Sequence, residues 1–219
     1  MPTAADKPPP ALGADRPGGA LARVAVDGMG GDRAPGVVVD GAVQAARTLQ
    51  GVEVILVGPE DRMKAELSRF RDVPPNLRVY HAAEVIGMGE SPAISVRKKR
   101  DSSINQMVEL AKRGEADAIV SAGNTGAMVV AASLGLGMLE GIELPGIAIL
   151  IPSLKSPTFV IDVGANIDSK PEHLSQYGVM GSVFMEHVLG RANPSVGLLN
   201  VGEEEGKGTD FIRQSFKLL

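Results

Sequence analysis

The sequence predicts an α/β fold, a Rossmann-like three-layer αβα structure with a doubly wound, mostly parallel sheet. Hydrophobic residues make up 44% of the 219 residues but aromatic residues only 3%, which suits an aliphatic sheet covered by helices on both faces. Short β-branched runs also alternate with segments of helical spacing. Continuous apolar strands joined by right-handed crossovers give a doubly wound sheet.

The predicted strands follow in order along the chain. The β-branched apolar runs are 24–27, 54–57, 77–81, 118–121, 147–151, 158–162 and 196–200. Segments with helical spacing, such as 36–49 and 107–113, separate most of them. Only a short proline-containing link joins 147–151 to 158–162, so we expect a short antiparallel hairpin there.

The ends of the chain differ from its middle. Residues 1–22 are rich in Pro, Gly and Ala and lack the apolar run of a secretory signal, so they predict a disordered tail before a single α/β domain over 23–219. The uncharged stretch 118–139 contains Ser, Asn, Thr and several glycines. A strand, a turn and a helix explain it better than a membrane span.

Composition excludes several classes of function. A net charge of −4 argues against nucleic acid as a partner. The absence of cysteine removes disulfides, thiolate nucleophiles and cysteine metal sites, and it fits a reducing cytoplasm. No histidine pair has metal-ligand spacing, so no metal is expected. The stretch GMGGDRAPG does not fit G-x-G-x-x-G and no P-loop is present, so no nucleotide cofactor is predicted.

Function is expected just after the strands, because ligands of such sheets bind at the carboxyl ends of the strands. Four predicted strands end in a small polar or acidic residue followed by glycine. The loop residues of this kind are Asp27, Gly30, Gly31, Asp32, Ser121, Gly123, Asn124, Thr125, Gly126, Asp162, Gly164, Asn166 and Asn200. Each loop alone reads as a turn. Together they favour a ligand, and a helix that begins near Asn124 would direct free N–H groups at an anion such as phosphate.

Four longer motifs carry a family resemblance. The stretches VAVDGMGGDRAP, SAGNTGA, DVGANIDSKPEHLSQYGVMGSV and VGLLNVGEEEGKG occur in this order between residues 23 and 219. They closely resemble the PlsX-type phosphate acyltransferases of bacterial phospholipid synthesis. One departure is Gly28, which stands where this family usually has alanine.

The resemblance implies transfer of a fatty acyl group from acyl-(acyl-carrier protein) to inorganic phosphate, without cofactor or metal. Phosphate itself would attack the thioester, which agrees with the lack of a G-x-S-x-G motif and of cysteine. Phosphate is expected at the turn 123–126, with Ser121. The candidate catalytic residues are Asp27, Asn124, Asp162, Asn166, Lys170 and His173. The resemblance also implies a homodimer in the cytoplasm with peripheral membrane contact.

Several residues keep two interpretations. Ser169 and Glu172 have the spacing of a capping box, so Glu172 is more readily a helix cap than a catalytic acid, and His173 is either a site residue or a packed helix residue. A basic run is either a solvated face or a docking surface for an acidic carrier protein. It consists of Arg97, Lys98, Lys99 and Arg100.

The last residues predict a helix capped by Thr209 that runs to Leu219. Proteins of the resembled family continue with further strands and helices, so the resemblance implies a chain shortened at its C-terminus. The alternatives are therefore an inactive fragment that keeps only carrier-protein or subunit binding, or a phosphotransacetylase-like enzyme that uses acyl-CoA.

Overall fold

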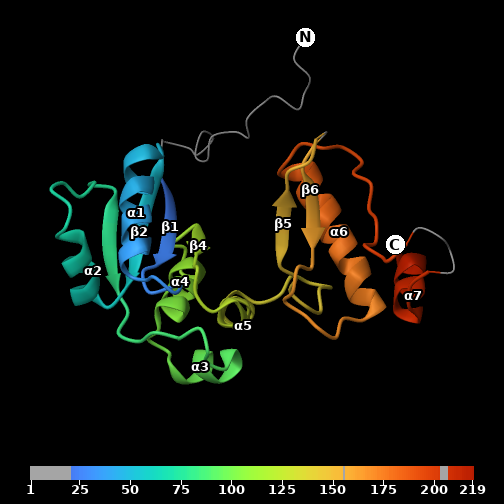
Figure 1. Ribbon diagram of the computed structural model, residues 1–219, viewed down its shortest axis with the longest axis horizontal. Helices are drawn as coiled ribbons and strands as arrows, with labels where there is room; N and C mark the ends of the chain where they lie inside the picture. The colour runs from blue at the N-terminus through green and yellow to red at the C-terminus, as the bar shows by residue number, and fades with distance from the viewer. Residues whose placement is uncertain (1–20, 155, 203–206) are drawn as a thin grey trace, which may run out of the picture. The chain divides into compact units, whose positions relative to one another are not determined.

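The computed structural model describes residues 21–154, 156–202 and 207–219 (Figure 1). The predicted tail lies outside these residues except for Leu21 and Ala22, and Ala22 already belongs to the first strand. The chain divides into two compact units, one ending at Gly137 and the other formed by Met138–Leu219. Each unit is described by itself.

The first unit is built on a parallel sheet of four strands in the order β3-β2-β1-β4. The strands are β1 (Ala22–Asp27), β2 (Val52–Gly58), β3 (Leu77–His81) and β4 (Ala118–Val120). All four agree with predicted runs, and the crossover from β3 to β4 places the last strand beside the first. The Rossmann-like prediction is confirmed for this sheet.

Helices cover both faces of the sheet. They are α1 (Gly36–Thr48), α2 (Glu60–Leu67), α3 (Pro92–Lys98), α4 (Ser103–Lys112) and α5 (Thr125–Leu136). Along β2, Val54 and Leu56 pack in one core with α1 and α2, whereas Ile55 and Val57 pack in another with α3, α4 and α5. This alternation is that of a strand buried on both faces, and it gives three layers. Full burial of one such side chain stabilises the fold by about 1.5–3 kcal/mol.

The second unit contains the predicted hairpin. Strands β5 (Ala148–Ile151) and β6 (Thr158–Ile161) pair antiparallel in a sheet of their own. Helix α6 (Pro171–His187) packs on β6, where the rings of Phe159 and Phe184 stack with centroids 4.6 Å apart. Helix α7 (Asp210–Leu218) packs on α6 and begins as predicted, since Thr209 Oγ1 accepts from the Ile212 N–H over 3.4 Å.

One predicted strand is wrong. Among the described residues, 196–200 pair with no strand, and Val196 and Leu199 are 50% and 93% exposed. β-Branched and apolar residues favour strands because their side chains pack against a neighbouring strand, not because of an intrinsic backbone preference. Where no neighbouring strand is paired, such residues need not form a strand.

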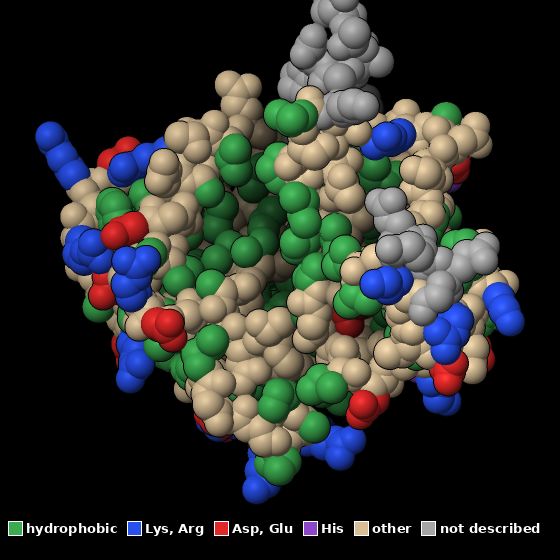
Figure 2. All heavy atoms as spheres, turned by 45° about the vertical axis from the view of Figure 1, so that its right-hand side comes forward, with side chains coloured by type: hydrophobic (Ala, Val, Ile, Leu, Met, Phe, Trp, Pro, Cys, Tyr) green, Lys and Arg blue, Asp and Glu red, His purple; other side chains and the backbone are tan. Residues whose placement is uncertain are grey.

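The two units differ in how much apolar surface they bury. The buried large hydrophobic residues of the second unit are Tyr177 and Met185, whereas both core clusters belong to the first. Figure 2 shows hydrophobic side chains lying exposed on one face of the molecule. The exposed large hydrophobic residues of the second unit include Leu139, Ile149, Leu150, Ile151, Leu154, Ile167, Val179, Val183, Leu199 and Phe216. In the part of the chain that the structure describes, every helix is too short or too polar to cross a bilayer.

Candidate functional site

The strand register brings two candidate residues of the first unit together. Val26 of β1 lies opposite Val120 of β4, so the next residues, Asp27 and Ser121, leave the sheet side by side. Ser121 Oγ donates to Asp27 Oδ2 over 2.7 Å and accepts from the Gly123 N–H over 2.9 Å. Asp27 Oδ1 accepts from the Met29 N–H over 3.1 Å. The Asp27 carboxylate, only 3% exposed, therefore organises the loops after β1 and β4.

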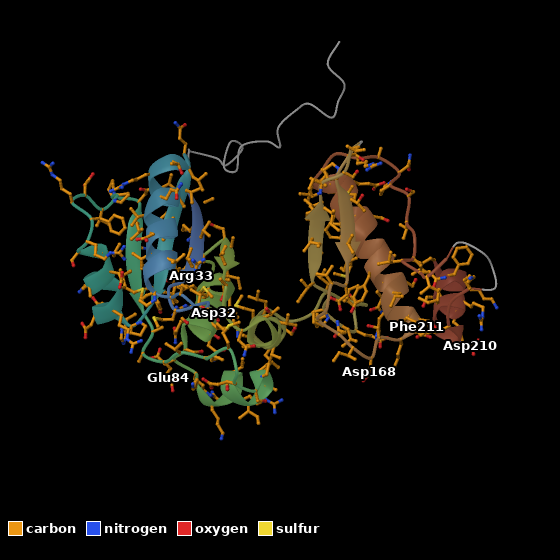
Figure 3. All side chains as sticks on the ribbon, viewed as in Figure 1. Asp32, Arg33, Glu84, Asp168, Asp210 and Phe211 are labelled. Carbon is orange, nitrogen blue, oxygen red and sulfur yellow. The ribbon has the colours of Figure 1, made fainter. Side chains whose placement is uncertain are left out.

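Two glycines let these loops touch. A Cβ at Gly30 would lie 2.8 Å from Asp27 Oδ2 and 2.9 Å from the backbone nitrogen of Gly123, and a Cβ at Gly123 would lie 3.1 Å from both Asp27 Oδ2 and Ser121 Oγ. Gly31 has φ +99°, a conformation that favours glycine. Asp32 follows in the exposed part of this loop (Figure 3). Gly30 and Gly123 thus serve close loop packing.

Helix α5 begins after Asn124, as the sequence predicts, and the Asn124 side chain caps it. Its Oδ1 accepts from the Ala127 N–H over 3.0 Å, which is a standard N-cap bond. Its Nδ2 donates to three carbonyl oxygens of another loop, at Gly87, Met88 and Glu90, over 3.1–3.2 Å. The side chain is 6% exposed, and these contacts occupy its amide.

The first turn of α5 presents unused donors. The N–H groups of Thr125 and Gly126 make no hydrogen bond within the described residues, and the Thr125 side chain is exposed. They lie in the β4–α5 turn, which we define as residues 121–126. Free N–H groups and the positive end of the helix dipole favour an anion at such a position. Gly126 also packs against α3, because a Cβ there would lie 2.7 Å from Pro92 Cγ.

The loop that Asn124 contacts, residues 85–92, is held by Glu90. Glu90 Oε1 accepts from Lys99 Nζ over 2.5 Å and from the Gly87 N–H over 2.8 Å, and its Oε2 accepts from Ser95 Oγ over 2.8 Å. These bonds, with Lys99 foremost, lower the pKa of Glu90 to about 2. Lys99 Nζ also donates to the Val85 carbonyl over 2.7 Å. We call residues 85–92 the Glu90 loop.

The basic run is consequently not uniform. Lys99 points its ammonium group into the Glu90 loop, whereas Arg97, Lys98 and Arg100 are exposed. Three cations of this run are therefore on the surface, where they can meet an acidic partner. The fourth, Lys99, holds the Glu90 loop in place.

In the second unit, Asp162 organises the loop after β6. Its Oδ1 accepts from the N–H groups of Ile147, Gly164 and Ala165, and its Oδ2 accepts from the backbone and the side-chain amide of Asn166, all over 2.9–3.1 Å. Burial acts to raise the pKa of Asp162, but these hydrogen bonds outweigh it and hold the pKa below its usual value. The backbone N–H groups of residues 164–166 are thus bound by a carboxylate of the chain itself.

Asn166 extends this network towards α6. Its Nδ2 also donates to the Pro145 carbonyl over 2.6 Å and to the Tyr177 hydroxyl oxygen over 3.0 Å. Burial and the neighbouring Asp162 carboxylate raise the pKa of Tyr177, so this phenol stays protonated and donates to the Pro145 carbonyl over 3.3 Å. Asp162 and Asn166 are therefore brought together, as members of one half-buried polar network with Tyr177.

The start of α6 differs by one residue from the expected capping box. Lys170, not Ser169, is the N-cap residue, and His173, not Glu172, is the third residue of the helix. His173 Nδ1 accepts from the Lys170 N–H over 3.0 Å, so the ring proton lies on Nε2, which donates to Glu143 Oε2 over 3.3 Å. His173 is 4% exposed, whereas the Lys170 side chain is exposed. Proline at the first helical position fixes this start and explains the shift.

The hydrogen bonds of Asn200 are made to the connection before α7 and not to the Asp162 loop. Its Nδ2 donates to the carbonyl oxygens of Gly202 and Lys207 over 3.3 and 3.4 Å, and Gly208 packs against its amide. These bonds close the connection that leads into α7, where Asp210 and Phe211 begin the helix (Figure 3).

The predicted site residues thus form separate groups. One joins Asp27, Gly30, Ser121 and Gly123 in the first unit, where Asn124 is the next residue in the chain, and another joins Asp162, Gly164 and Asn166 in the second. Sequence reasoning missed Glu90, Glu143 and Tyr177. Glu90 lies beside Gly87 and Gly89 and just before a Ser-Pro helix start, a signal that the search at strand ends passed over because β3 ends earlier, at His81. Among the described residues, no group of three or more His, Asp or Glu side chains could hold a metal ion.

The fold and the glycine-rich loops at the ends of its strands define a Rossmann-like α/β protein. Residues 22–219 match the family model described as "Fatty acid synthesis protein". The chain belongs to this family, which confirms the resemblance drawn from the four motifs.

Individual relatives agree with this assignment. The chain is 49% identical over 199 residues to a phosphate acyltransferase of Desulfitobacterium hafniense (strain Y51), covering 91% of this chain and 59% of the relative. It is 47% identical over 197 residues to a phosphate acyltransferase of Trichlorobacter lovleyi, covering 90% of this chain and 57% of the relative. The chain therefore spans less than two thirds of the length of these relatives.

Solved structures support the fold alone. The EutD phosphotransacetylase from Staphylococcus aureus matches with a TM-score of 0.62 at 19% identity, over 90% of this chain and 63% of that one. A phosphotransacetylase from Streptococcus pyogenes matches with a TM-score of 0.61 at 18% identity, over 90% and 64%.

Proposed function

We propose that this chain carries the phosphate-binding part of an acyltransferase that moves a fatty acyl group from acyl-carrier protein to inorganic phosphate. The name phosphate acyltransferase, borne by relatives 47–49% identical to it, supports this reaction class. The product, an acyl phosphate, would serve phospholipid synthesis in the cytoplasm.

The observation that carries the proposal is the open start of α5. Thr125 and Gly126 offer two backbone N–H groups without partners in the described residues, at the positive end of a helix and at the carboxyl end of the parallel sheet. Phosphate needs donors of this kind. The buried Asp27 carboxylate would repel an anion, so its role in the proposal is to hold the two loops rather than to bind phosphate.

The chemistry requires no protein nucleophile. A phosphate oxygen attacks the thioester carbonyl carbon, the new carbon–oxygen bond forms, and the carbon–sulfur bond breaks as the tetrahedral intermediate collapses. The electron pair leaves with the carrier thiolate, which takes a proton from solvent or from an acid. The protein aligns the two substrates and stabilises the developing oxyanion.

The second unit supplies the remaining candidates. Lys170 is exposed at the start of α6, and its positive charge would attract an anionic group to this part of the second unit. His173 has its Nε2 proton directed at Glu143, and Asp162 and Asn166 are engaged in their own network. We therefore assign Lys170 the electrostatic role and the other three the role of holding this loop and helix start.

Partners follow from surface charge. Acyl-carrier protein is acidic, and the exposed cations Arg97, Lys98 and Arg100 on and after α3 would attract it. A homodimer and peripheral membrane contact belong to the same proposal and are tested by the mass of the particle in solution and by vesicle sedimentation.

Thiol release tests the reaction. We expect free carrier thiol to appear when the chain is mixed with acyl-carrier protein thioester and phosphate, and not when phosphate is omitted. Faster release from acyl-CoA than from the acyl-carrier protein would instead favour a phosphotransacetylase-like enzyme. A folded chain that releases no thiol but retains the carrier on a column would mark a binding fragment.

A backbone substitution tests the phosphate position. Thr125→Pro removes one N–H donor, yet proline suits the first position of a helix and Asn124 before it is already extended, with ψ 105°. We expect phosphate to bind about tenfold more weakly, which corresponds to loss of one charge-assisted hydrogen bond. Thr125→Ala keeps the N–H and is the matched control. Equal binding by both variants would contradict phosphate at this turn.

A further inference from the structure

The Glu90 carboxylate ties the Glu90 loop to helix α3 by hydrogen bonds on both sides of it. It joins Lys99 at the end of α3, Ser95 within α3 and the Gly87 N–H, so that loop and helix form one piece. Three donors on one carboxylate fix both of its oxygens. We call the Glu90–Lys99 pair, with the bonds to Gly87 and Ser95, the Glu90 clasp.

The clasped segment contacts the β4–α5 turn at two places. Asn124 Nδ2 donates to three carbonyl oxygens of the Glu90 loop, including that of Glu90 itself. Gly126 fits against Pro92 so closely that a Cβ would lie 2.7 Å from Pro92 Cγ. The first turn of α5 is therefore located by the Glu90 loop, although the two lie more than thirty positions apart in the sequence.

We propose that Glu90 and Lys99 are positioning residues that set the place of the Thr125 and Gly126 N–H groups. As a statement about phosphate, this rests on the proposed function, whereas the effect on the turn can be measured without any ligand. Two N–H groups bind one anion well only when both point at it, because hydrogen bonds weaken steeply with misalignment. A turn fixed in advance avoids the entropy cost of ordering on binding.

The clasp should act locally rather than on the whole fold. The side chains of Lys99 and Glu90 are 32% and 34% exposed, and ion pairs with that access to water contribute little to global stability. The effect of this pair on loop position should exceed its effect on global stability, because the loop that it closes contacts Asn124. A positioning role thus predicts faster exchange at the turn with sheet exchange unchanged, whereas a purely structural role predicts equal changes at the turn and throughout the sheet.

The experiment uses the whole chain labelled with ¹⁵N. Amide hydrogen exchange of Ala127, whose N–H is bonded to Asn124 Oδ1, reports the cap, and exchange in β1 to β3 reports the sheet. Inorganic phosphate is then titrated while the Thr125 and Gly126 amide signals are followed. The variants are Glu90→Gln, Lys99→Met, both together, and Ser95→Ala, which removes only one bond of the clasp.

Glu60→Gln is the matched control. Glu60 on α2 also pairs with a lysine, Lys64, over the same Nζ to Oε1 distance of 2.5 Å. This pair lies within α2 and does not include the β4–α5 turn. The control should leave Ala127 exchange and phosphate affinity within about twofold of the unaltered chain.

We expect Glu90→Gln and Lys99→Met each to speed Ala127 exchange about tenfold and to weaken phosphate binding by a similar factor, with sheet exchange unchanged. The double variant should resemble either single one, since both remove the same clasp. Unchanged Ala127 exchange in both single variants would overturn the proposal, and so would equal changes throughout the sheet. If Ala127 responds but phosphate shifts neither amide in the unaltered chain, the positioning stands and the phosphate site of the proposed function fails.

Discussion

At the scale of single residues, Asn124 fixes two backbone segments at once. Its Oδ1 accepts from the Ala127 N–H in the first turn of α5, and its Nδ2 donates to three carbonyl oxygens of the Glu90 loop. Only a side chain with both an acceptor and two N–H donors can do this. The N-cap position alone would tolerate Ser, Thr or Asp as well.

Asn124→Asp should therefore destabilise the first unit even though aspartate is a good N-cap. The new carboxylate would face three carbonyl oxygens without a donor, at a cost of about 2–4 kcal/mol. Urea unfolding followed by circular dichroism measures the change. Gln44→Glu makes the same amide-to-acid change at an exposed position of α1 and should cost less than about 0.5 kcal/mol. Comparable losses in the two variants would contradict the role of the Nδ2 bonds.

Asp162 gives a pH prediction of definite sign. Its pKa in the folded chain lies below the value of 3.8 expected for an unperturbed carboxyl. Its hydrogen bonds thus contribute stability that is present above that value and is lost as the pH falls through the folded pKa. Asp162→Asn should flatten the loss of stability below about pH 4. Asp168→Asn, at an exposed carboxylate of the same loop (Figure 3), is the control and should keep the full loss, and identical acid curves for Asp162→Asn and the unaltered chain would refute the assignment.

At the scale of elements, the junction of α3 and α5 depends on a glycine. Gly126 lies in the first turn of α5, where alanine would ordinarily favour the helix by up to about 1 kcal/mol. The added methyl would instead meet the ring of Pro92. The two effects have opposite signs, so the sign of the measured change shows which prevails.

Gly126→Ala should destabilise the first unit by about 1–3 kcal/mol, because the clash with Pro92 separates the two helices. Gly41→Ala is the matched substitution, since a Cβ at Gly41 of α1 meets nothing within 4 Å, and it should stabilise by up to about 1 kcal/mol. The midpoints of urea unfolding measure both. A stabilised Gly126→Ala chain would show that α3 is free to move away.

The exposed charges at the end of α3 should speed association with acyl-carrier protein. Lys98→Ala removes an exposed charge, and we expect slower association with acyl-carrier protein at low salt, by about two- to threefold, with the difference vanishing at high salt. Lys112→Ala on α4 removes a charge of the same kind elsewhere and is the control. Stopped-flow association measures the rates, and equal slowing in both variants would reduce the basic run to a solvated face.

At the scale of the whole molecule, the two units bury very different amounts of apolar surface. Residues 21–137 contain both core clusters, whereas the second unit buries Tyr177 and Met185 among its large hydrophobic residues. Since burial of apolar area is the main source of stability, the units should differ in their ability to fold alone.

The fragment 21–137 should fold by itself, and the fragment 138–219 should not. We expect a cooperative urea transition and dispersed amide signals for the first, and an absence of both for the second. The matched comparison is the same amide signals in the 219-residue chain. A fragment 21–137 without cooperative unfolding would show that its cores need residues beyond Gly137.

Much of this architecture follows from local sequence. The strands β1 to β4 and the hairpin could be predicted because their short apolar runs are bounded by turn residues or by segments of helical spacing. The Asp27–Ser121 contact follows because parallel strands end at one edge of the sheet. The rest depends on distant partners. Residues 196–200 have the composition of a strand, but no strand of the described residues pairs with them. The close packing of Gly126 on Pro92 joins two segments far apart in the sequence, and neither segment alone predicts it. The start of α6 was missed by one residue because Ser169 and Lys170 are followed by equally plausible partners three positions on.

The register of β1 beside β4 also sets an order of events during synthesis. Asp27 is made early, yet its partner Ser121 lies 94 residues later, so the pair cannot form until most of the first unit has left the ribosome. Compared with the neighbouring pairing of Asp27 and Val57, closing this longer loop costs about 1 kcal/mol more in chain entropy. The nascent chain can thus assemble β1, β2 and β3 around α1 and α2 first. The β4–α5 turn would then be the last part of this sheet edge to form, and a chain released before residue 121 would lack the bond between Asp27 and Ser121.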